Sequence, residues 1–341
     1  MKPELSELLF IEDLFSRSME NKNVLPEELG HVERLTGDAS TRRYYRLFTL
    51  SNSYVVCIDN PTETGENTFV KTQEFLQKYN IRVPRILDRI VNKGYILEED
   101  LGDTTLLKYL ADISTRKDEL EVYKQIIDMM IDLHLISKED IDKSKKFQLA
   151  FNQEKLDEEI KFSTNYFLKK FLKIEDDDVC SIVEGEFKKI TSRLSQQKRV
   201  LTHRDFHSRN IMVKDSEFIL IDFQDARMGI PQYDLVSLIE DCYYELSSDS
   251  REKLIEYYYK KLPAEIHEQG SFENFKSLYR DMALQRVFKA IGSFSYIYDT
   301  RGDVRYVKYI GFAMEKLKCI LMQDNKYETL KKTLFGYYYE S

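Results

Sequence analysis

The 341-residue sequence contains no tryptophan, few cysteines and no long apolar segment. Its cysteines, Cys57, Cys180, Cys242 and Cys319, lie far apart and form no C-x-x-C pair, which argues against a zinc site and predicts free thiols in a reducing compartment. No segment approaches the roughly 20 apolar residues that span a bilayer, and acidic residues interrupt the apolar start of the chain, unlike a signal peptide. We therefore expect a cytoplasmic protein that binds no membrane.

Positive charge is also in short supply. The chain has 51 Lys and Arg residues against 59 Asp and Glu residues, which gives a net charge of -8. Proteins that bind nucleic acid through its phosphates carry the opposite balance, so we expect no nucleic-acid partner. The length is sufficient for two lobes with a sizeable core, and we expect a monomer.

The richest motif lies in residues 200–225, which read V-L-T-H-R-D-F-H-S-R-N-I-M-V, K-D-S-E and F-I-L-I-D-F-Q-D. Asp205 is followed five residues later by Asn210, and Asp222 follows a dozen residues after that. The pattern H-R-D-x-x-x-x-N followed by D-F is that of a kinase catalytic loop and its metal-binding aspartate.

The spacing of this motif has a physical interpretation. Residues 211–213 and 218–221 are apolar and flank a polar turn, so they predict a hairpin whose two ends meet. Asn210 begins the first strand and Asp222 follows the second, and their oxygens are hard ligands suited to Mg²⁺. Asp205 is then placed to orient a substrate hydroxyl and accept its proton. The alternative is an ordinary hairpin with polar ends, since Asp and Asn are common where strands stop.

The order of predicted elements indicates an α+β protein with two lobes. The first hundred residues read as an antiparallel sheet with one intervening helix at 66–79, preceded by a helix at 4–18; the strands are expected at 32–35, 44–48, 54–58, 83–87 and 95–98. A polar hinge follows at 98–103. Helices dominate thereafter, and they are expected at 104–110, 120–135, 151–172, 177–195, 234–247, 250–261, 271–298 and 303–322. We thus expect a lobe at 1–100 and a mostly helical lobe at 101–341, which carries the catalytic loop (200–225) and a helical cap insertion (about 147–198).

The chain resembles the aminoglycoside phosphotransferase family, which has a two-lobed protein-kinase-like fold. The resemblance covers nearly the whole chain and rests on seven stretches: G-D-A-S-T-R-R-Y-Y-R at 37–46, V-P-R-I-L at 83–87, L-E-E-D-L-G-D at 97–103, H-R-D-F-H-S-R-N at 203–210, L-I-D-F-Q-D-A at 220–226, Y-D-L-V-S-L at 233–238 and Q-R-V-F-K-A-I-G-S-F at 285–294. The last stretch looks like a marker of the family's amino-sugar kinases, which implies an ATP- and Mg²⁺-dependent kinase of an amino-sugar acceptor.

The resemblance also implies roles for particular residues. Asp205 resembles the catalytic base, and Asn210 and Asp222 resemble the Mg²⁺ ligands. The phosphate-covering loop is expected at Gly37, Asp38, Ala39, Ser40 and Thr41, although an ordinary hairpin turn would look the same. The hinge whose backbone holds adenine is expected at Glu98, Glu99 and Asp100.

One expected residue is missing. Kinases usually carry a Lys on the third strand that binds the nucleotide phosphates, and Ile58 stands at about that position. Arg42 and Arg46 share a face of the preceding strand at a period of two, so one of them is the candidate replacement. Solvent-facing arginines would give the same pattern.

The acceptor is expected to contact the cap segment and the catalytic loop. Glu158, Phe162 and Tyr166 recur every four residues and offer an aromatic wall with a hydrogen-bonding group, but a helix packing one aromatic stripe on the core would look alike. In and after the loop, His207, Arg209 and Asp225 are further candidates for contacts with the acceptor or the phosphates. Their alternatives are a structural hydrogen bond, a salt bridge and a turn cap, respectively.

Three functions are compatible with these motifs. The resemblance implies a kinase that phosphorylates the anomeric hydroxyl of N-acetylmuramate or N-acetylglucosamine in cell-wall recycling. A second possibility keeps the kinase and changes the acceptor to an aminoglycoside, choline or another amino alcohol, which the carboxylates of Asp225, Asp234, Glu240 and Asp241 would attract. The third is a nucleotide-binding pseudokinase, whose only support is the missing Lys.

Overall fold

The computed structural model describes residues 5–35, 42–61, 67–266 and 270–339, which group into two compact units. One unit contains the described residues up to Thr104 together with Met212–Gln224, and the other contains Thr105–Ile211 and the described residues from Asp225 onward. The turn predicted at Gly37, Asp38, Ala39, Ser40 and Thr41 lies outside the described residues.

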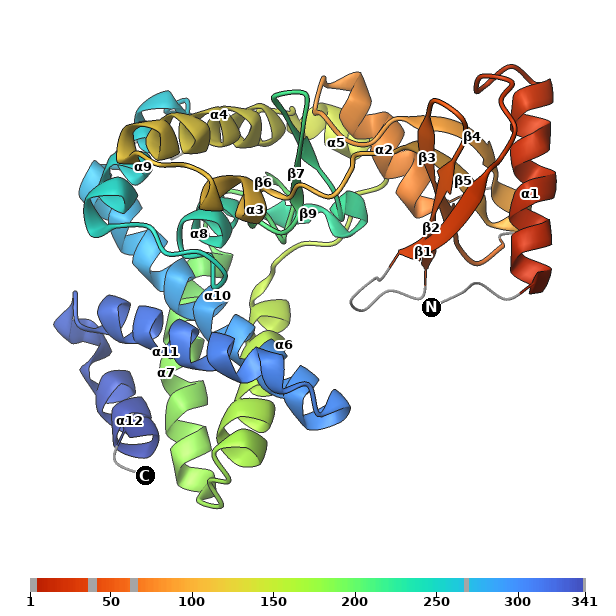
Figure 1. Ribbon diagram of the computed structural model, residues 1–341. Helices are drawn as coiled ribbons and strands as arrows, with labels where there is room; N and C mark the ends of the chain where they lie inside the picture. Colours follow the sequence, from red (N-terminus) through yellow and green to blue (C-terminus); the bar gives the residue numbers. More distant parts are fainter. Residues whose placement is uncertain (1–4, 36–41, 62–66, 267–269, 340–341) are drawn as a thin grey trace. The chain divides into compact units, whose positions relative to one another are not determined.

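The first unit is built on a five-stranded antiparallel sheet in the order β1-β2-β3-β5-β4 (Figure 1). Its elements in chain order are α1 (Leu5–Glu20), β1 (His31–Leu35), β2 (Arg43–Phe48), β3 (Ser53–Ile58), α2 (Thr68–Lys78), β4 (Ile86–Ile90), the 3-10 turn η1 (Val91–Lys93) and β5 (Tyr95–Glu99). The β7–β8 hairpin, with strands Ile211–Lys214 and Glu217–Leu220, groups with this unit from Met212 onward.

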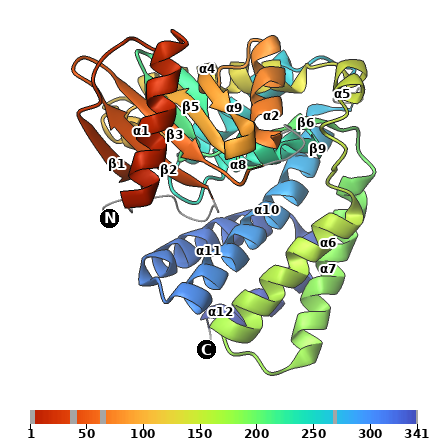
Figure 2. The same cartoon turned by 90° about the vertical axis from the view of Figure 1, so that its right-hand side faces the viewer.

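Alternation along the strands explains which face of this sheet is apolar. Tyr45, Leu47, Val56 and Leu97 point to one face and form a core with Phe15 of α1, which lies across that face in Figure 2. Side chains one residue out of step point to the opposite face, because successive side chains of a strand alternate.

The turn into β5 requires a glycine. Gly94 has φ of +70°, and a Cβ at this position would lie 2.0 Å from the carbonyl oxygen of Asp59. The strand before it begins at Ile86 and not at Val83 as expected. Pro84 has no backbone N–H to contribute to a ladder, which accounts for the later start.

The second unit is mostly helical, with one short pair of strands. Its helices are α3 (Leu106–Ala111), α4 (Arg116–His134), α5 (Lys138–Ser144), α6 (Gln153–Ser163), the π-helix η2 (Thr164–Phe171), α7 (Asp177–Ser195), α8 (Gln232–Ile239), α9 (Ser248–Lys261), α10 (Phe272–Arg301), α11 (Val307–Leu321) and α12 (Glu328–Tyr339), with short 3-10 turns at Val304–Tyr306 and Asn325–Tyr327. A further 3-10 turn, Phe223–Asp225, lies at the boundary between the two units in the sequence. Strands β6 (Val200–Thr202) and β9 (Arg227–Gly229) pair antiparallel.

The long helix α10 organises the second unit. It contacts α6, η2, α7, α8 and α11, and Figure 2 shows α6 and α11 beside it. Within the parts of the chain that the structure describes, no helix is both long and apolar enough to cross a membrane.

Candidate active site

The predicted catalytic loop begins where β6 ends, and a buried carboxylate on α8 holds it there. Asp234 is fully buried and accepts hydrogen bonds from the backbone N–H of His203 at 2.6 Å and of Arg204 at 3.0 Å. Its Oδ2 also lies 3.2 Å from Nε2 of His134 on α4. Two backbone donors and a ring nitrogen therefore converge on one carboxylate, which fixes the first residues of the H-R-D motif.

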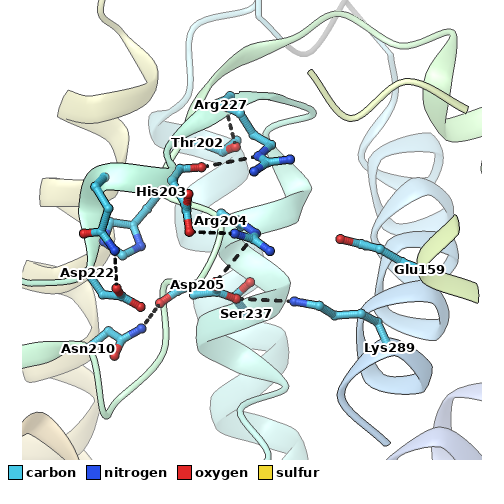
Figure 3. A network of polar contacts seen from close by, with 12 residues as sticks. Glu159, Thr202, His203, Arg204, Asp205, Asn210, Asp222, Arg227, Ser237 and Lys289 are labelled. Carbon is cyan, nitrogen blue, oxygen red and sulfur yellow. Dashed lines mark hydrogen bonds and ion pairs between the residues drawn. The ribbon is translucent and has the colours of Figure 1, made fainter. Parts of the chain in front are cut away.

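Arg204 has a backbone conformation that few non-glycine residues adopt. Its φ is +85°, in the region where a side chain crowds the neighbouring backbone at a cost of about 1–2 kcal/mol. Its backbone N–H is held by Asp234, and its Nη1 lies 2.9 Å from Oδ2 of Asp225. These contacts hold the strained residue in place and direct its side chain toward the carboxylates (Figure 3).

Asp205 lies among three cationic side chains. Its Oδ1 is 3.5 Å from Nη1 of Arg286 and 3.5 Å from Nζ of Lys289, both on α10, and its Oδ2 is 3.7 Å from Nε of Arg204 (Figure 3). Burial by itself raises the pKa of Asp205, but Lys289, Arg286 and Arg204 hold that pKa well below its usual range. The carboxylate is therefore ionised and poised to accept a hydrogen bond.

Lys289 and Arg286 were not singled out from the sequence. Burial lowers the pKa of the Lys289 ammonium, although Asp205 raises it, and Arg286 also donates to the hydroxyl of Tyr233 at 2.9 Å. The sequence feature that could have pointed to them is the presence of two cations in the mostly apolar stretch Q-R-V-F-K-A-I-G. The contact joins residues more than 80 positions apart, so local periodicity could not assign a partner to either cation.

The carboxylate near this group is Glu159, and the structure does not bring Glu158 there. Glu158 is exposed and pairs with Lys155 at 3.0 Å. Glu159 is buried and accepts a hydrogen bond from Nε2 of Gln285 on α10 at 3.0 Å. One helical position, a rotation of about 100°, separates the two faces. In Figure 3 the side chains of Glu159 and Lys289 extend toward the same side, where Arg204 and Asp205 lie.

Phe162 and Tyr166 do lie together, as their spacing predicts. Their ring centroids are 4.7 Å apart. The helix changes to the wider π form at Thr164, between the two residues. Tyr296 of α10, which no local sequence pattern pointed to, contacts both rings.

His207 and Arg209 are placed against an aromatic ring. The His207 ring meets Tyr243 edge-on with centroids 5.4 Å apart, and the Arg209 guanidinium lies 4.9 Å from the centroid of the same ring. Burial lowers the pKa of His207, which favours the neutral imidazole. Its backbone N–H donates to the carbonyl oxygen of Asp205 at 3.0 Å, so His207 braces the loop.

Asn210 and Asp222, the expected metal ligands, flank the β7–β8 hairpin. Nδ2 of Asn210 donates to the carbonyl oxygen of Asp205 at 3.0 Å. Asp222 has φ of +62° and accepts a hydrogen bond from Gln224 at 2.6 Å. Among the residues that the structure describes, no cluster of three or more His, Cys, Asp or Glu side chains could hold a metal. Binding of Mg²⁺ by Asn210 and Asp222 therefore stays a prediction.

On the first unit, Ile58 stands at about the position of the usual kinase Lys, but its side chain points to the opposite face of the sheet from Cys57. The side chain of Ile58 belongs to the core with α1, whereas its neighbour Cys57 is paired with Tyr44 on the other face. On that face Arg42 pairs with Asp59 at 3.0 Å, and its guanidinium lies 5.1 Å from the centroid of the Phe69 ring. The sheet thus presents a fixed cation just before β2, where kinases present one from β3.

The second candidate cation, Arg46, forms ion pairs and a hydrogen bond with residues of the predicted hinge. It pairs with Asp100 at 2.9 Å and Asp103 at 3.0 Å and donates to the carbonyl oxygen of Gly102. Glu99 is paired with Arg82 and Arg85. These hinge side chains therefore stabilise the first unit, and adenine recognition by the hinge backbone stays a prediction.

Glu98 differs from its neighbours because its carboxyl is buried with no close ion pair among the residues that the structure describes. Burial raises the pKa of Glu98 to about 8, and the nearby Arg42 offsets only part of this effect. Unfolded chains release this proton near pH 4.5. Between these pH values the folded state binds more protons than the unfolded state, so stability falls as the pH rises.

We expect the free energy of unfolding of the wild-type protein to fall by roughly 2 kcal/mol between pH 5 and pH 8 because of Glu98. Each unit by which the pKa of Glu98 differs between the folded and unfolded states can contribute at most about 1.4 kcal/mol to this decrease. The substitution Glu98→Gln should remove most of this decrease. Urea titrations followed by circular dichroism at both pH values would measure it, with exposed Glu74→Gln as the control. An equal pH dependence in both variants would contradict the prediction.

Comparisons with known proteins agree with this architecture. A sequence model of the phosphotransferase enzyme family matches residues 31–268. The N-acetylmuramate/N-acetylglucosamine kinase of Pseudomonas aeruginosa is 30% identical over 80% of this chain and 78% of that protein. The enzyme of the same name from Neisseria meningitidis is 27% identical over 84% of each chain.

Solved structures with little sequence identity share the fold. An aminoglycoside phosphotransferase complexed with gentamicin matches with a TM-score of 0.62 at 15% identity, covering 96% of this chain and 99% of that one. A choline kinase from Streptococcus pneumoniae matches with a TM-score of 0.59 at 17% identity, covering 90% and 99%. The predicted two-lobed kinase-like fold is confirmed. The chain belongs to the phosphotransferase enzyme family, and it is a phosphotransferase that acts on an alcohol group.

Proposed function

We propose that this protein transfers the γ-phosphoryl group of ATP to the anomeric hydroxyl of N-acetylmuramate or N-acetylglucosamine. The observation that carries the proposal is the ionised Asp205, held in a fixed loop by Asp234 and surrounded by Arg204, Arg286 and Lys289. The names of the relatives from Pseudomonas aeruginosa and Neisseria meningitidis support the choice of acceptor.

In the proposed reaction, the acceptor hydroxyl donates a hydrogen bond to Asp205. Its oxygen attacks the γ-phosphorus while the bond from phosphorus to the bridging oxygen of ADP breaks. Because the pKa of Asp205 is well below its usual range, the carboxylate takes the proton late, as the oxygen becomes bonded to phosphorus. Water then receives that proton. Asp205 thus contributes mainly by orienting the hydroxyl.

Mg²⁺ fits the residues that flank the hairpin, since the amide oxygen of Asn210 and the carboxylate of Asp222 are hard oxygen ligands. These two residues would hold it. When bound, the ion would neutralise negative charge on the nucleotide phosphates. Arg42, fixed by Asp59, is our candidate for the cation that replaces the usual third-strand Lys.

Lys289 is one of two cationic side chains on α10 that could stabilise negative charge beside Asp205. Its side chain is 17% exposed, and a cation with little water around it acts more strongly on charge that develops in the transition state. We expect Lys289→Met to lower kcat by about 10- to 100-fold, with the KM for ATP nearly unchanged. Lys289→Arg should recover part of the loss because it keeps the charge. Steady-state assays would test this, and equal activity of the Met and Arg variants would contradict it.

An amino-alcohol acceptor is the second candidate, and the structure weakens its main support. Three of the carboxylates that would attract a cation already have hydrogen-bond donors. Asp234 and Asp241 accept hydrogen bonds from backbone N–H groups, and Glu240 accepts a hydrogen bond from the hydroxyl of Tyr279. All three are buried. A bound cation would also face Lys289 and Arg286, which would repel it.

The test is ADP release with ATP and Mg²⁺ against N-acetylmuramate, N-acetylglucosamine, glucose, kanamycin and choline. Phosphorus NMR of the product would locate the new phosphate. Turnover on the N-acetyl sugars with phosphate on the anomeric oxygen is the expected result. Turnover only on kanamycin or choline would overturn the choice of acceptor, and ATP binding without turnover on any compound would favour the pseudokinase.

A further inference from the structure

Three partly exposed aromatic rings form a patch on the second unit, here called the aromatic platform. It consists of Phe162 at the end of α6, Tyr166 in η2 and Tyr296 on α10. Each ring contacts the other two, with centroid distances of 4.7, 5.5 and 4.9 Å. Phe162 is 36% exposed and Tyr296 is 37% exposed. Large aromatic side chains gathered at a surface commonly mark a binding site.

The platform lies on the same helical face as the candidate active site. Tyr296 follows Lys289 by seven residues, which is nearly two full turns, so both side chains leave α10 in almost the same direction. The rise between them is about 10.5 Å. Because Lys289 contacts Asp205, the platform lies about two helical turns from the catalytic carboxylate.

Contacts between α10 and the α6–η2 segment keep this spacing constant. Glu159 meets Gln285, Ser163 meets Gly292, and Tyr166 meets Tyr296, so the two segments run side by side in the same direction. Figure 2 shows α6 beside α10. A Cβ at Gly292 would lie 2.4 Å from the Cα of Ser163, so the two backbones are in direct contact between the polar and the aromatic ends.

Polar groups border the platform in a way that suits a sugar. The Lys170 ammonium lies 4.5 Å from the centroid of the Tyr166 ring and pairs with Asp299 at 2.7 Å. A pyranose ring has an apolar face that can stack on an aromatic ring, and hydroxyl groups at its rim that need donors and acceptors. The platform with this ion pair supplies both.

We propose that the aromatic platform binds the second ring of a β-1,4-linked disaccharide of N-acetylated amino sugars, whose reducing end is phosphorylated at Asp205. This inference rests on the proposed sugar-kinase function. The anomeric oxygen and the 4-oxygen of a pyranose lie at opposite ends of the ring. A ring attached through the 4-oxygen therefore extends away from the reacting hydroxyl, toward a site two helical turns distant.

The phosphoryl transfer itself is the same as for the single sugar. The anomeric oxygen of the disaccharide becomes bonded to the γ-phosphorus, the bond to the bridging oxygen of ADP breaks, and the hydroxyl proton passes to Asp205. Only the stacking of the distal ring is added. Such stacking should increase kcat/KM for the disaccharide by about ten-fold over that for the single sugar.

The test compares N-acetylglucosamine with N,N'-diacetylchitobiose as acceptors for the wild-type protein and two variants. Tyr296→Ala removes the ring of the platform on α10. Tyr298→Ala is the matched control, since Tyr298 is on the same helix, is also 37% exposed and contacts Phe171 instead. Chitobiose reduced to its alcohol, which has no anomeric hydroxyl, should accept no phosphate.

We expect Tyr296→Ala to lower kcat/KM for chitobiose by about ten-fold and to change that for N-acetylglucosamine by less than about two-fold, while Tyr298→Ala changes neither. The inference is overturned if the wild-type protein phosphorylates N-acetylglucosamine but not chitobiose, or if Tyr296→Ala lowers both values equally. Absence of turnover on both sugars would instead overturn the proposed function, and the inference with it.

Discussion

Replacing Asp205 with Asn should lower turnover by at least about 1,000-fold, a loss of roughly 4 kcal/mol of transition-state stabilisation. The amide has nearly the same shape as the carboxylate, but it cannot accept the proton of the acceptor hydroxyl. It also removes the negative charge that Lys289 and Arg286 contact at 3.5 Å. Because ATP binding does not require this carboxylate, we expect the affinity for ATP to change little.

The measurement is kcat with the best acceptor of the panel, together with calorimetric titration of ATP in the presence of Mg²⁺. Glu158→Gln is the control, since it removes an exposed carboxylate that pairs with Lys155, and it should leave kcat unchanged. If Asp205→Asn retained more than about a tenth of the wild-type kcat, the assignment of Asp205 as the catalytic group would be wrong.

The largest expected loss of stability follows from Asp234→Ala. This change leaves the backbone N–H groups of His203 and Arg204 without their acceptor in a buried site. Each orphaned buried donor costs about 1–3 kcal/mol. We therefore expect the free energy of unfolding to fall by about 3–5 kcal/mol, with kcat also reduced because the loop that carries Asp205 is no longer fixed.

Asp234→Asn distinguishes loss of charge from loss of the acceptor, since the amide keeps one oxygen for a backbone N–H. It should fall between the wild-type protein and the Ala variant. The control is Asp249→Ala, which breaks an exposed pair with Lys253 and should cost less than about 0.5 kcal/mol. Urea titrations would measure all three variants, and a loss below about 1 kcal/mol for Asp234→Ala would contradict the prediction.

Much of the fold could be predicted because its signals are local. Strands β2, β3 and β5 of the first unit contain short apolar and aromatic runs next to polar turns, and α10 has a helical pattern that predicts residues 271–298 against the observed Phe272–Arg301. Strand β9 was missed because Arg227–Gly229 is too short to show a period of two. Helix α12 was missed as well, since its sequence E-T-L-K-K-T-L-F-G-Y-Y-Y buries only Leu330 and Leu334.

The same difference between local and distant signals decides which residues of the candidate site could be predicted. Asp205, Asn210 and Asp222 could be predicted as a group because a motif within about 20 residues contains them all. Arg286 and Lys289 reach Asp205 from a helix more than 80 residues away, and no local pattern reports such a contact. Glu158 was chosen over Glu159 because a period of four was assumed for the segment, whereas the buried face of α6 includes Glu159 and excludes Glu158.

Helices α6 and α10 can lie as close together as they do because Gly292, where α10 contacts Ser163 of α6, has no side chain. Any residue larger than glycine at 292 would place a Cβ within 2.3–2.5 Å of Ser163 atoms, so α6 and α10 would have to move apart. Glu159 and Phe162 would then move away from Lys289 and Tyr296, one from each side of the contact. For an engineer, position 292 is therefore the place at which the distance between these side chains of the two helices can be changed without replacing any of them.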